Sequence, residues 1–280
     1  MIIWIASYPK SGNTWIRSFI SAILNTQDGN FSFKNLESIP QYPIRQQFEG
    51  FLQDFSDINN IKKNWITTQT KLNLDNEVKF LKTHHVNCKI ENDAFTNFDN
   101  TLGVIYIVRD PRNVITSLKN HYLFETYDET LKFMFDENKY LGSKYGTKSD
   151  LVPTVIGSWR TNYNSWKIMK KNFLIIKYES LISEPEKEFK KVSDHVSKLL
   201  DIKFEYKKIK DAIDASSFDK MQEMEKNYGF VESPIDNKTG NKLKFFNLGP
   251  KNIWEKYLSD EIRFKIEDSF KLEMKELDYL

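Results

Sequence analysis

The 280-residue sequence contains a single cysteine, Cys88. One cysteine forms no intrachain disulfide and no thiolate cluster for zinc, so we expect a buried or neutral thiol. The lack of a disulfide framework suits a reducing compartment, and we therefore expect a cytoplasmic protein.

Long hydrophobic runs are also missing. No stretch approaches the roughly 20 apolar residues of a membrane span. The first segment, MIIWIAS, has no basic region and soon reaches Pro9 and Lys10, unlike a secretory signal peptide. We expect no membrane span.

Charge of one sign is not in excess, because 41 Lys and Arg nearly balance 39 Asp and Glu. No net field draws the protein to a nucleic acid polymer or an acidic membrane, so we expect neither as a partner. Any anion-binding site must be local.

The apolar residues that are present, 40% of the chain, suffice for one large α/β domain. Short apolar runs predict buried strands, and longer amphipathic stretches predict helices between or after them. This alternation predicts a single domain with a mostly parallel central sheet flanked by helices. The predicted strands are residues 2–7, 78–83, 102–108 and 173–178, and the predicted helices include 14–24, 111–122 and 155–171.

Two segments, residues 27–76 and 125–153, have weaker periodicity and are rich in Asn, Asp, Lys and aromatic residues. We interpret them as lids or acceptor-side helical insertions within one domain that spans 1–280. Each predicted strand ends in polar residues, and ligands of open α/β sheets bind beyond the carboxyl ends of the strands. The chemistry should therefore converge on one edge of the sheet.

The segment YPKSGNTW follows the first strand and opens the first helix. A strand, a tight turn and a helix N-terminus aim backbone N–H groups and the helix dipole at an anion. Gly12 allows close backbone approach, Ser11, Asn13 and Thr14 supply polar groups, and Lys10 adds a charge. The lysine precedes the only glycine, so this P-loop-like segment is not a Walker A motif. Alone, it also fits a plain turn with a solvated lysine.

Three motifs together resemble the sulfotransferase family. YPKSGNTW matches its 5′-phosphosulfate loop, FLKTHH matches its catalytic K-T-H strand end, and YIVRDPRNVITS gives its Arg with a Ser eight residues later. The resemblance continues through KYESL to FFNLGPKNIW. It implies in-line transfer of a sulfuryl group from 3′-phosphoadenosine 5′-phosphosulfate (PAPS) to an acceptor hydroxyl or amine, with 3′-phosphoadenosine 5′-phosphate (PAP) as by-product and no metal.

The resemblance also implies roles for individual residues. Lys10 would neutralise charge on the leaving phosphate, and Ser11, Gly12, Asn13 and Thr14 would form the 5′-phosphate loop. The other donor-binding residues would be Trp15 and Tyr178 at the adenine, Arg109 and Ser117 at the 3′-phosphate, and Ser216, Phe218 and Gly249 from later motifs. The acceptor would be a small-molecule, carbohydrate or lipid hydroxyl.

Lys82 and His84 are the predicted catalytic pair on the second strand. Successive strand residues point to opposite faces, so Lys82 and His84 share a side while His85 points away. A neutral histidine suits proton abstraction, and the K-T-H match also selects His84 as the general base. We expect His85 to be packed or on the surface.

The family's R-K-G element is replaced by Asn247, Leu248 and Gly249. Either Lys251, just beyond, supplies a cation for the 3′-phosphate, or Arg109 holds it alone. The proline that usually follows the catalytic histidine is absent from HHVNC, and EKYLSDEIRF does not reproduce the family's dimer segment, so the oligomeric state is open.

The sequence leaves two alternative functions open. A P-loop-type nucleotide kinase would need a Walker A order and an Asp for Mg²⁺, for which Asp110 is the sole candidate. A catalytically silent nucleotide-binding protein of the same fold is the other alternative. The intact Lys10, Lys82 and His84 argue against it.

Overall fold

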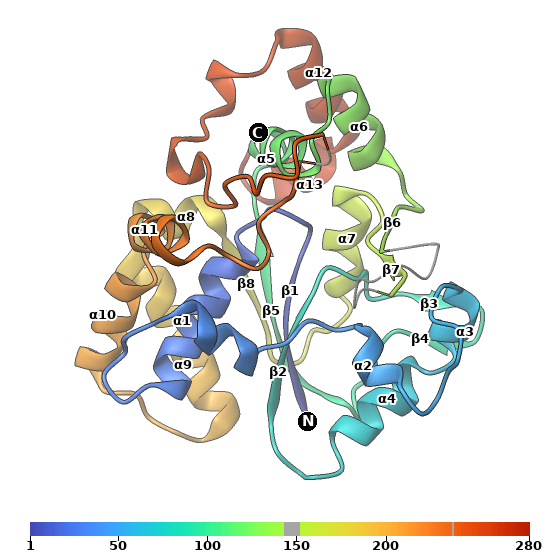
Figure 1. Cartoon of the computed structure of the whole chain (residues 1–280), viewed down its shortest axis with the longest axis vertical. Coiled ribbons are helices and arrows are strands. Elements are labelled where there is room, and N and C mark those ends of the chain that lie inside the picture. Colours follow the sequence, from blue (N-terminus) through green and yellow to red (C-terminus); the bar gives the residue numbers. More distant parts are fainter. Residues whose placement is uncertain (143–151, 237) are drawn as a thin grey trace.

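The computed structural model describes residues 1–142, 152–236 and 238–280 (Figure 1). Its centre is a four-stranded sheet in the order β2-β1-β5-β8, and every neighbouring pair is parallel. The predicted α/β domain with a parallel sheet is confirmed. The strands are β1 (Ile2–Ser7), β2 (Lys79–Thr83), β5 (Thr101–Val108) and β8 (Phe173–Lys177).

Strand β1 lies inside the sheet, and all six of its residues are buried. Its side chains alternate between two hydrophobic cores. Ile2, Trp4 and Ala6 belong to one core, whereas Ile3 and Ile5 belong to the other. A strand covered on both faces needs the continuous apolar run that the sequence shows.

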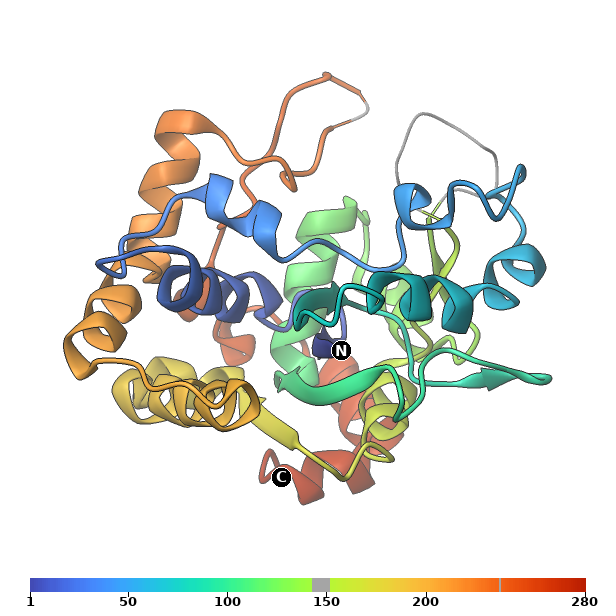
Figure 2. The same ribbon diagram turned by 90° about the horizontal axis from the view of Figure 1, so that it is seen from below.

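Helices cover both faces of the sheet, as Figures 1 and 2 show. One core joins Ile3 and Ile5 to α1 (Asn13–Asn25), α8 (Tyr178–Ser183), α9 (Pro185–Leu200), α10 (Tyr206–Ala215) and α11 (Phe218–Tyr228). The other core joins Trp4 to α4 (Trp65–Leu72), α5 (Pro111–Tyr122), α6 (Tyr127–Phe135), α7 (Trp159–Trp166), α12 (Asp260–Ser269) and α13 (Lys271–Glu276).

The helix predicted over 155–171 is shorter in the structure. Val155 instead belongs to β7 (Thr154–Val155), which pairs antiparallel with β6 (Tyr140–Leu141). Helix α7 begins only after Ser158, whose side chain accepts a hydrogen bond from the Thr161 N–H and caps the helix.

The segment 27–76 contains short helices that are part of the fold: η1 (Phe33–Ser38), α2 (Arg45–Phe48), α3 (Ile58–Lys62) and α4. Phe48 and Trp65 are fully buried, so much of this segment packs on the sheet. In the second segment, 125–153, residues 143–151 lie outside the described residues.

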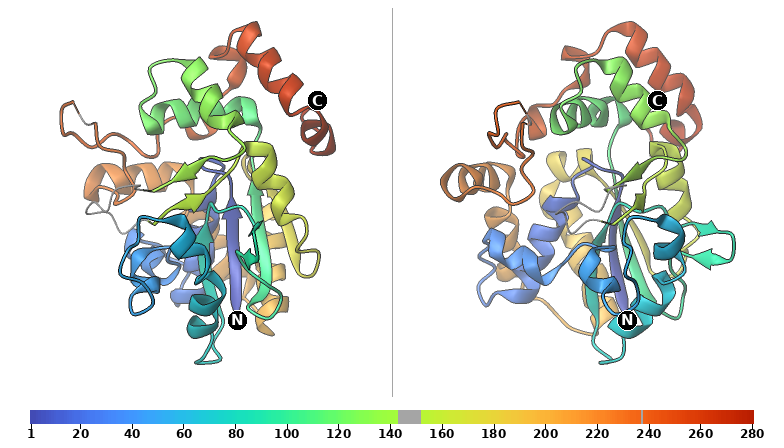
Figure 3. Two further views of the ribbon diagram at one scale, coloured as in Figure 1. Left: turned by 90° about the vertical axis from the view of Figure 1, so that its right-hand side faces the viewer. Right: turned by 45° about the vertical axis from the view of Figure 1, so that its right-hand side comes forward.

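The two chain termini lie at opposite ends of the sheet (Figure 3). A short pair of strands, β3 (Lys89–Ile90) and β4 (Asp93–Ala94), follows β2, and two 3₁₀ turns, η2 (Gly249–Lys251) and η3 (Trp254–Lys256), precede the last helices.

Candidate active site

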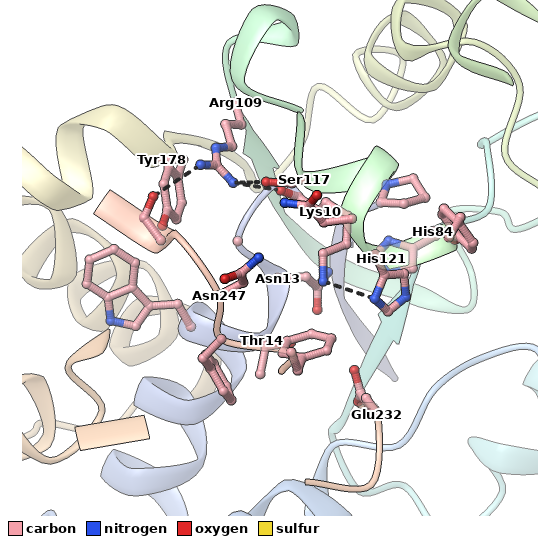
Figure 4. Close-up of a pocket in the computed structure, with 18 of the residues that line it drawn as sticks. Lys10, Asn13, Thr14, His84, Arg109, Ser117, His121, Tyr178, Glu232 and Asn247 are labelled. Carbon is pink, nitrogen blue, oxygen red and sulfur yellow. Dashed lines mark hydrogen bonds between the residues drawn. The ribbon is translucent and has the colours of Figure 1, made fainter. Parts of the chain in front are cut away.

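A cavity of about 450 Å³ lies beyond the carboxyl ends of the parallel strands (Figure 4). It brings together residues from the strand ends, from α1 and α5, and from the segment that follows α11. Most of the residues selected from the sequence line it: Lys10, Gly12, Asn13, Thr14, Trp15, Lys82, His84, Arg109, Ser117, Tyr178, Phe218 and Gly249.

Three of the selected residues do not line the cavity. Ser11 is fully buried, and Ser216 is buried and donates its hydroxyl hydrogen to the Ala212 carbonyl over 2.7 Å. Lys251 lies in η2 with an exposed side chain. The cation that does line the cavity from this part of the chain is Lys244.

The loop between β1 and α1 is shaped by two residues with positive φ angles, Lys10 at 65° and Gly12 at 102°. A Cβ on Gly12 would stand 2.5 Å from Cδ2 of Tyr178, so the tyrosine ring packs directly on the glycine. Glycine is therefore required twice, by its backbone conformation and by this contact.

Asn13 has a structural role that the sequence did not reveal. Its side-chain amide donates to the Ile5 carbonyl at 2.9 Å and to Ser7 Oγ at 3.2 Å. These bonds tie the start of α1 back to β1 and hold the loop in place.

Lys10 is half-buried and lines the cavity, with Nζ 3.7 Å from the centre of the Phe245 ring. Burial lowers the pKa of Lys10 to about 7, although the Glu232 carboxylate opposes the shift. Its Nζ donates to Nδ1 of His121 at 3.4 Å. The sequence analysis did not select His121; the available signal was its position four residues after Ser117, on the same face of α5.

His84 is held by the main chain. Its Nδ1 lies 2.8 Å from the Ser7 carbonyl oxygen, which only accepts, so Nδ1 carries the hydrogen and Nε2 is left as the basic nitrogen. Burial lowers the pKa of His84 to about 3, so the imidazole is neutral.

His84 and Lys82 both line the cavity, even though β2 ends at Thr83. His85 does not line it. Its ring is completely buried and stacks on Phe95 at 4.1 Å between centroids, so this histidine is packed, as expected.

Arg109 is fixed by three hydrogen bonds. It donates to Ser117 Oγ at 3.2 Å, to the Lys10 carbonyl at 3.2 Å and to the Gly249 carbonyl at 3.4 Å. The guanidinium carbon lies 4.1 Å over the Tyr178 ring. Arg109 and Ser117, both predicted to bind the 3′-phosphate, thus also contact each other directly.

Asp110 does not pair with Arg109. Its carboxylate binds Arg112 at 2.7 Å and accepts the Arg112 backbone N–H, which caps α5. The carboxylate that a kinase would use for Mg²⁺ is therefore engaged by Arg112.

Glu232 is a further cavity residue that the sequence did not reveal. Its carboxylate accepts hydrogen bonds from Lys82 at 2.9 Å and from Arg17 at 2.7 Å. It comes from the segment after α11, which has no periodic pattern that would have placed it here.

Three further features concern metal binding, membrane-spanning helices and the single cysteine. Within residues 1–142, 152–236 and 238–280, no group of three or more His, Cys, Asp or Glu side chains could hold a metal ion. The helices of that same part of the chain are too short or too polar to cross a membrane. Burial raises the pKa of Cys88 to about 11, so its thiol is neutral.

The sequence profile of the sulfotransferase domain matches residues 2–278. Similar proteins include flavonol 3-sulfotransferase of Flaveria bidentis, 24% identical over 95% of this chain and 79% of the relative. The 3-beta-hydroxysteroid sulfotransferase of Cavia porcellus is 26% identical over 90% of this chain and 76% of its own.

Solved structures share the fold. Mouse sulfotransferase SULT7A1 complexed with PAP aligns with a TM-score of 0.59 at 19% identity, covering 98% of this chain and 84% of that one. Retinol dehydratase in complex with androsterone and PAP aligns with a TM-score of 0.60 at 16% identity, over 98% and 80%. With the profile matched from end to end, this chain belongs to the sulfotransferase domain family.

Proposed function

We propose that the protein transfers a sulfuryl group from PAPS to a hydroxyl, or an amine, of an acceptor molecule and releases PAP. The observation that carries this proposal is the convergence of Lys10, Lys82 and Arg109 with His84 in one cavity. Three basic side chains suit a donor with phosphate groups at both ends, and a neutral imidazole suits an acceptor that must lose a proton.

The donor site fits an adenine nucleotide with a 3′-phosphate. Among the described residues, the buried Nε of Arg109 has no hydrogen-bond partner. Its Nη1 donates to Ser117, which also lines the cavity. Arg109 and Ser117 would hold the 3′-phosphate, while the backbone of the loop around Gly12, with Thr14, would hold the 5′-phosphate. Trp15, Tyr178 and Phe218 supply an aromatic wall for adenine.

The donor supplies a sulfuryl group whose departure leaves negative charge on the 5′-phosphate. Lys10 would neutralise this charge, and Lys82 would bind the moving group. His84 would accept the acceptor's proton at Nε2, because Nδ1 is engaged by Ser7. Sulfuryl transfer by these side chains requires no metal, and we propose a metal-free reaction.

For the acceptor we propose a small molecule with a hydroxyl group. Two relatives are named for flavonols and for 3-beta-hydroxysteroids, which supports this class. Beyond the proposed donor residues, the cavity lining combines polar and apolar groups, Gln41, Tyr122, Leu141, Thr154 and Phe245. The proposal also includes carbohydrate and lipid hydroxyls as acceptors. We further propose that the protein is cytoplasmic.

The deciding experiment is a screen of acceptor classes with radiolabelled PAPS in the presence of EDTA, combined with calorimetry of PAP and AMP. Labelled product with EDTA present, and tighter binding of PAP than of AMP, are expected. Transfer that needs added Mg²⁺ and ATP would favour the kinase, and PAP binding without transfer to any acceptor would favour the silent nucleotide-binding protein.

A further inference from the structure

Glu232 is the one acidic side chain among the described residues that line the cavity. Its two carboxylate oxygens are divided between two cations: Oε1 accepts from Arg17 and Oε2 accepts from Lys82. The side chains of Arg17 and Lys82 are only 5% and 7% exposed, and that of Glu232 is 26% exposed. Figure 4 shows Glu232 pointing into the cavity on the side of His84 and His121.

The backbone around Glu232 is at the surface. Its neighbour Val231 is 88% exposed, although Phe230, one residue earlier, is buried in the hydrophobic core. The carboxylate nevertheless turns inward to join α1, through Arg17, to the end of β2, through Lys82. Ordinary packing does not require a charged side chain at such a place, because burying charge costs free energy unless it is paired.

The charges around Lys82 explain what the carboxylate does. The other ionisable groups that act on this part of the cavity are the Arg17 and Arg109 cations, Lys10, the neutral imidazoles of His84 and His121, and, from outside the cavity lining, Glu225. Glu232 is therefore the only nearby negative charge among the described residues that line the cavity. Without it, Lys82 and Arg17 would face each other as buried cations.

The pKa shifts agree with this picture. Burial lowers the pKa of Lys82, and the Glu232 carboxylate raises it again in part. Burial alone would raise the pKa of Glu232, but Lys82 and Arg17 hold it well below its usual range. The carboxylate is thus ionised and favours the charged form of Lys82.

We propose that Glu232 is a positioning residue that keeps Lys82 charged and directed at the sulfuryl group of the donor. An ammonium group has three hydrogens, and among the described contacts Lys82 Nζ donates one to Glu232. Lys82 can therefore contact the donor without leaving the carboxylate. The proposal rests on the proposed function, since it assigns the Lys82 ammonium to the sulfuryl group of PAPS.

The test needs no acceptor. PAPS and PAP differ by the sulfuryl group, so the ratio of their dissociation constants reports the contact of Lys82 with that group. Calorimetry would measure both ligands between about pH 6.5 and about pH 8.5 in the wild-type protein and in Glu232→Gln, Lys82→Gln and Glu225→Gln.

Glu232→Gln keeps the shape of the side chain and removes its charge. Loss of a carboxylate lowers the pKa of Lys82, so the ammonium should be lost on raising the pH. We expect PAPS affinity to fall about tenfold relative to PAP at the upper pH and less than about threefold at the lower pH. The variant should resemble Lys82→Gln at the upper pH and the wild type at the lower one.

Glu225→Gln is the matched control. Glu225 binds the backbone N–H groups of Phe245 and Phe246 and the hydroxyl of Ser233, so it fastens the same segment without touching Lys82. This variant should weaken PAPS and PAP together, with no dependence of their ratio on pH.

Each outcome of this experiment supports or contradicts the proposal. A PAPS to PAP ratio in Glu232→Gln that equals the wild-type ratio at every pH, or that changes equally at every pH, would overturn the proposal. If Glu232→Gln does not fold, Glu232→Asp serves instead, because it moves the charge away from Lys82 by one methylene. The loss of PAPS affinity relative to PAP should then occur at an intermediate pH. An unchanged PAPS to PAP ratio in this variant would overturn the proposal. A wild-type protein that binds neither nucleotide would instead refute the proposed function.

Discussion

Nδ1 of His84 donates a hydrogen bond to the main-chain carbonyl oxygen of Ser7, 77 residues earlier, over 2.8 Å. Ser7 is the last residue of β1, and its hydroxyl also accepts from the Asn13 side chain at the start of α1. The imidazole and the phosphate-type loop are therefore fastened to the same strand end. This arrangement fixes the distance between the proposed base and the proposed donor site.

Replacement of His84 by Asn should abolish most turnover. The Asn amide can still donate to the Ser7 carbonyl, but it cannot accept a proton, and a general base typically contributes about 10²–10⁴-fold to the rate. Steady-state assays with an acceptor found in the screen should show this loss, while PAP affinity by calorimetry should stay within about twofold.

His85→Ala serves as the comparison for that experiment. It should lower the thermal stability, because His85 stacks on Phe95 in the core, and should leave turnover largely intact at low temperature. Loss of turnover in His85→Ala with retention in His84→Asn would reverse the assignment of the base.

Arg109→Lys should weaken PAP much more than AMP. A lysine cannot reproduce the planar fork that now reaches Ser117 and lies over Tyr178, and one charge-assisted hydrogen bond is worth about 1.5–3 kcal/mol, or roughly 10–100-fold in affinity. Calorimetry with both nucleotides measures the difference. Equal losses of affinity for PAP and AMP would show that Arg109 does not bind the 3′-phosphate.

Lys251→Ala should leave PAP affinity unchanged, because Lys251 is exposed and lies outside the cavity lining. Lys244→Ala should weaken PAP up to about fivefold, since an exposed lysine beside a bound anion contributes at most about 1 kcal/mol. A larger loss in Lys251→Ala than in Lys244→Ala would mean that the turn rearranges on binding.

Gly12→Ala should impair nucleotide binding at least about tenfold, because its Cβ would lie 2.5 Å from Tyr178 at a φ of 102°. Gly50→Ala is a suitable control: φ is also positive there, at 86°, but nothing lies within 4 Å of the added Cβ. The control should cost about 1–2 kcal/mol of stability and leave PAP binding intact. Unimpaired PAP binding by Gly12→Ala would show that the loop can move off Tyr178.

The buried histidines should make the protein sensitive to mild acid. Burial lowers the pKa of His85 to about 3, below its unfolded value, so the unfolded chain binds the proton first as the pH falls. Stability is lost from about pH 6.5 downward, by about 1.4 kcal/mol per pH unit for each such histidine. His85→Phe, which can still stack on Phe95, should reduce the slope of unfolding free energy against pH by about that amount in denaturant titrations between about pH 6 and about pH 5. An unchanged slope would show that protonation of His85 in the unfolded chain does not cause this loss of stability.

The sequence by itself determined the features whose signal is local. The apolar runs predicted all four strands of the sheet. The spacing of Arg109 and Ser117, fixed by one helix, made both available to the same ligand, although their direct contact at 3.2 Å was not predicted. The loop at Lys10 and Gly12 could also be predicted, because a strand, a turn and a helix in succession are encoded by adjacent residues.

Only the tertiary structure decided the contacts between distant segments. Lys82 and Glu232 are 150 residues apart, and no periodicity in the segment after α11 indicates that the carboxylate turns inward while Val231 stays exposed. The outward direction of Lys251 was equally hidden, since the η2 turn is shaped by the packing of Gly249 against Phe218. A local pattern specifies which face of a strand or helix is buried, whereas the partner of a buried charge depends on how all the segments pack together.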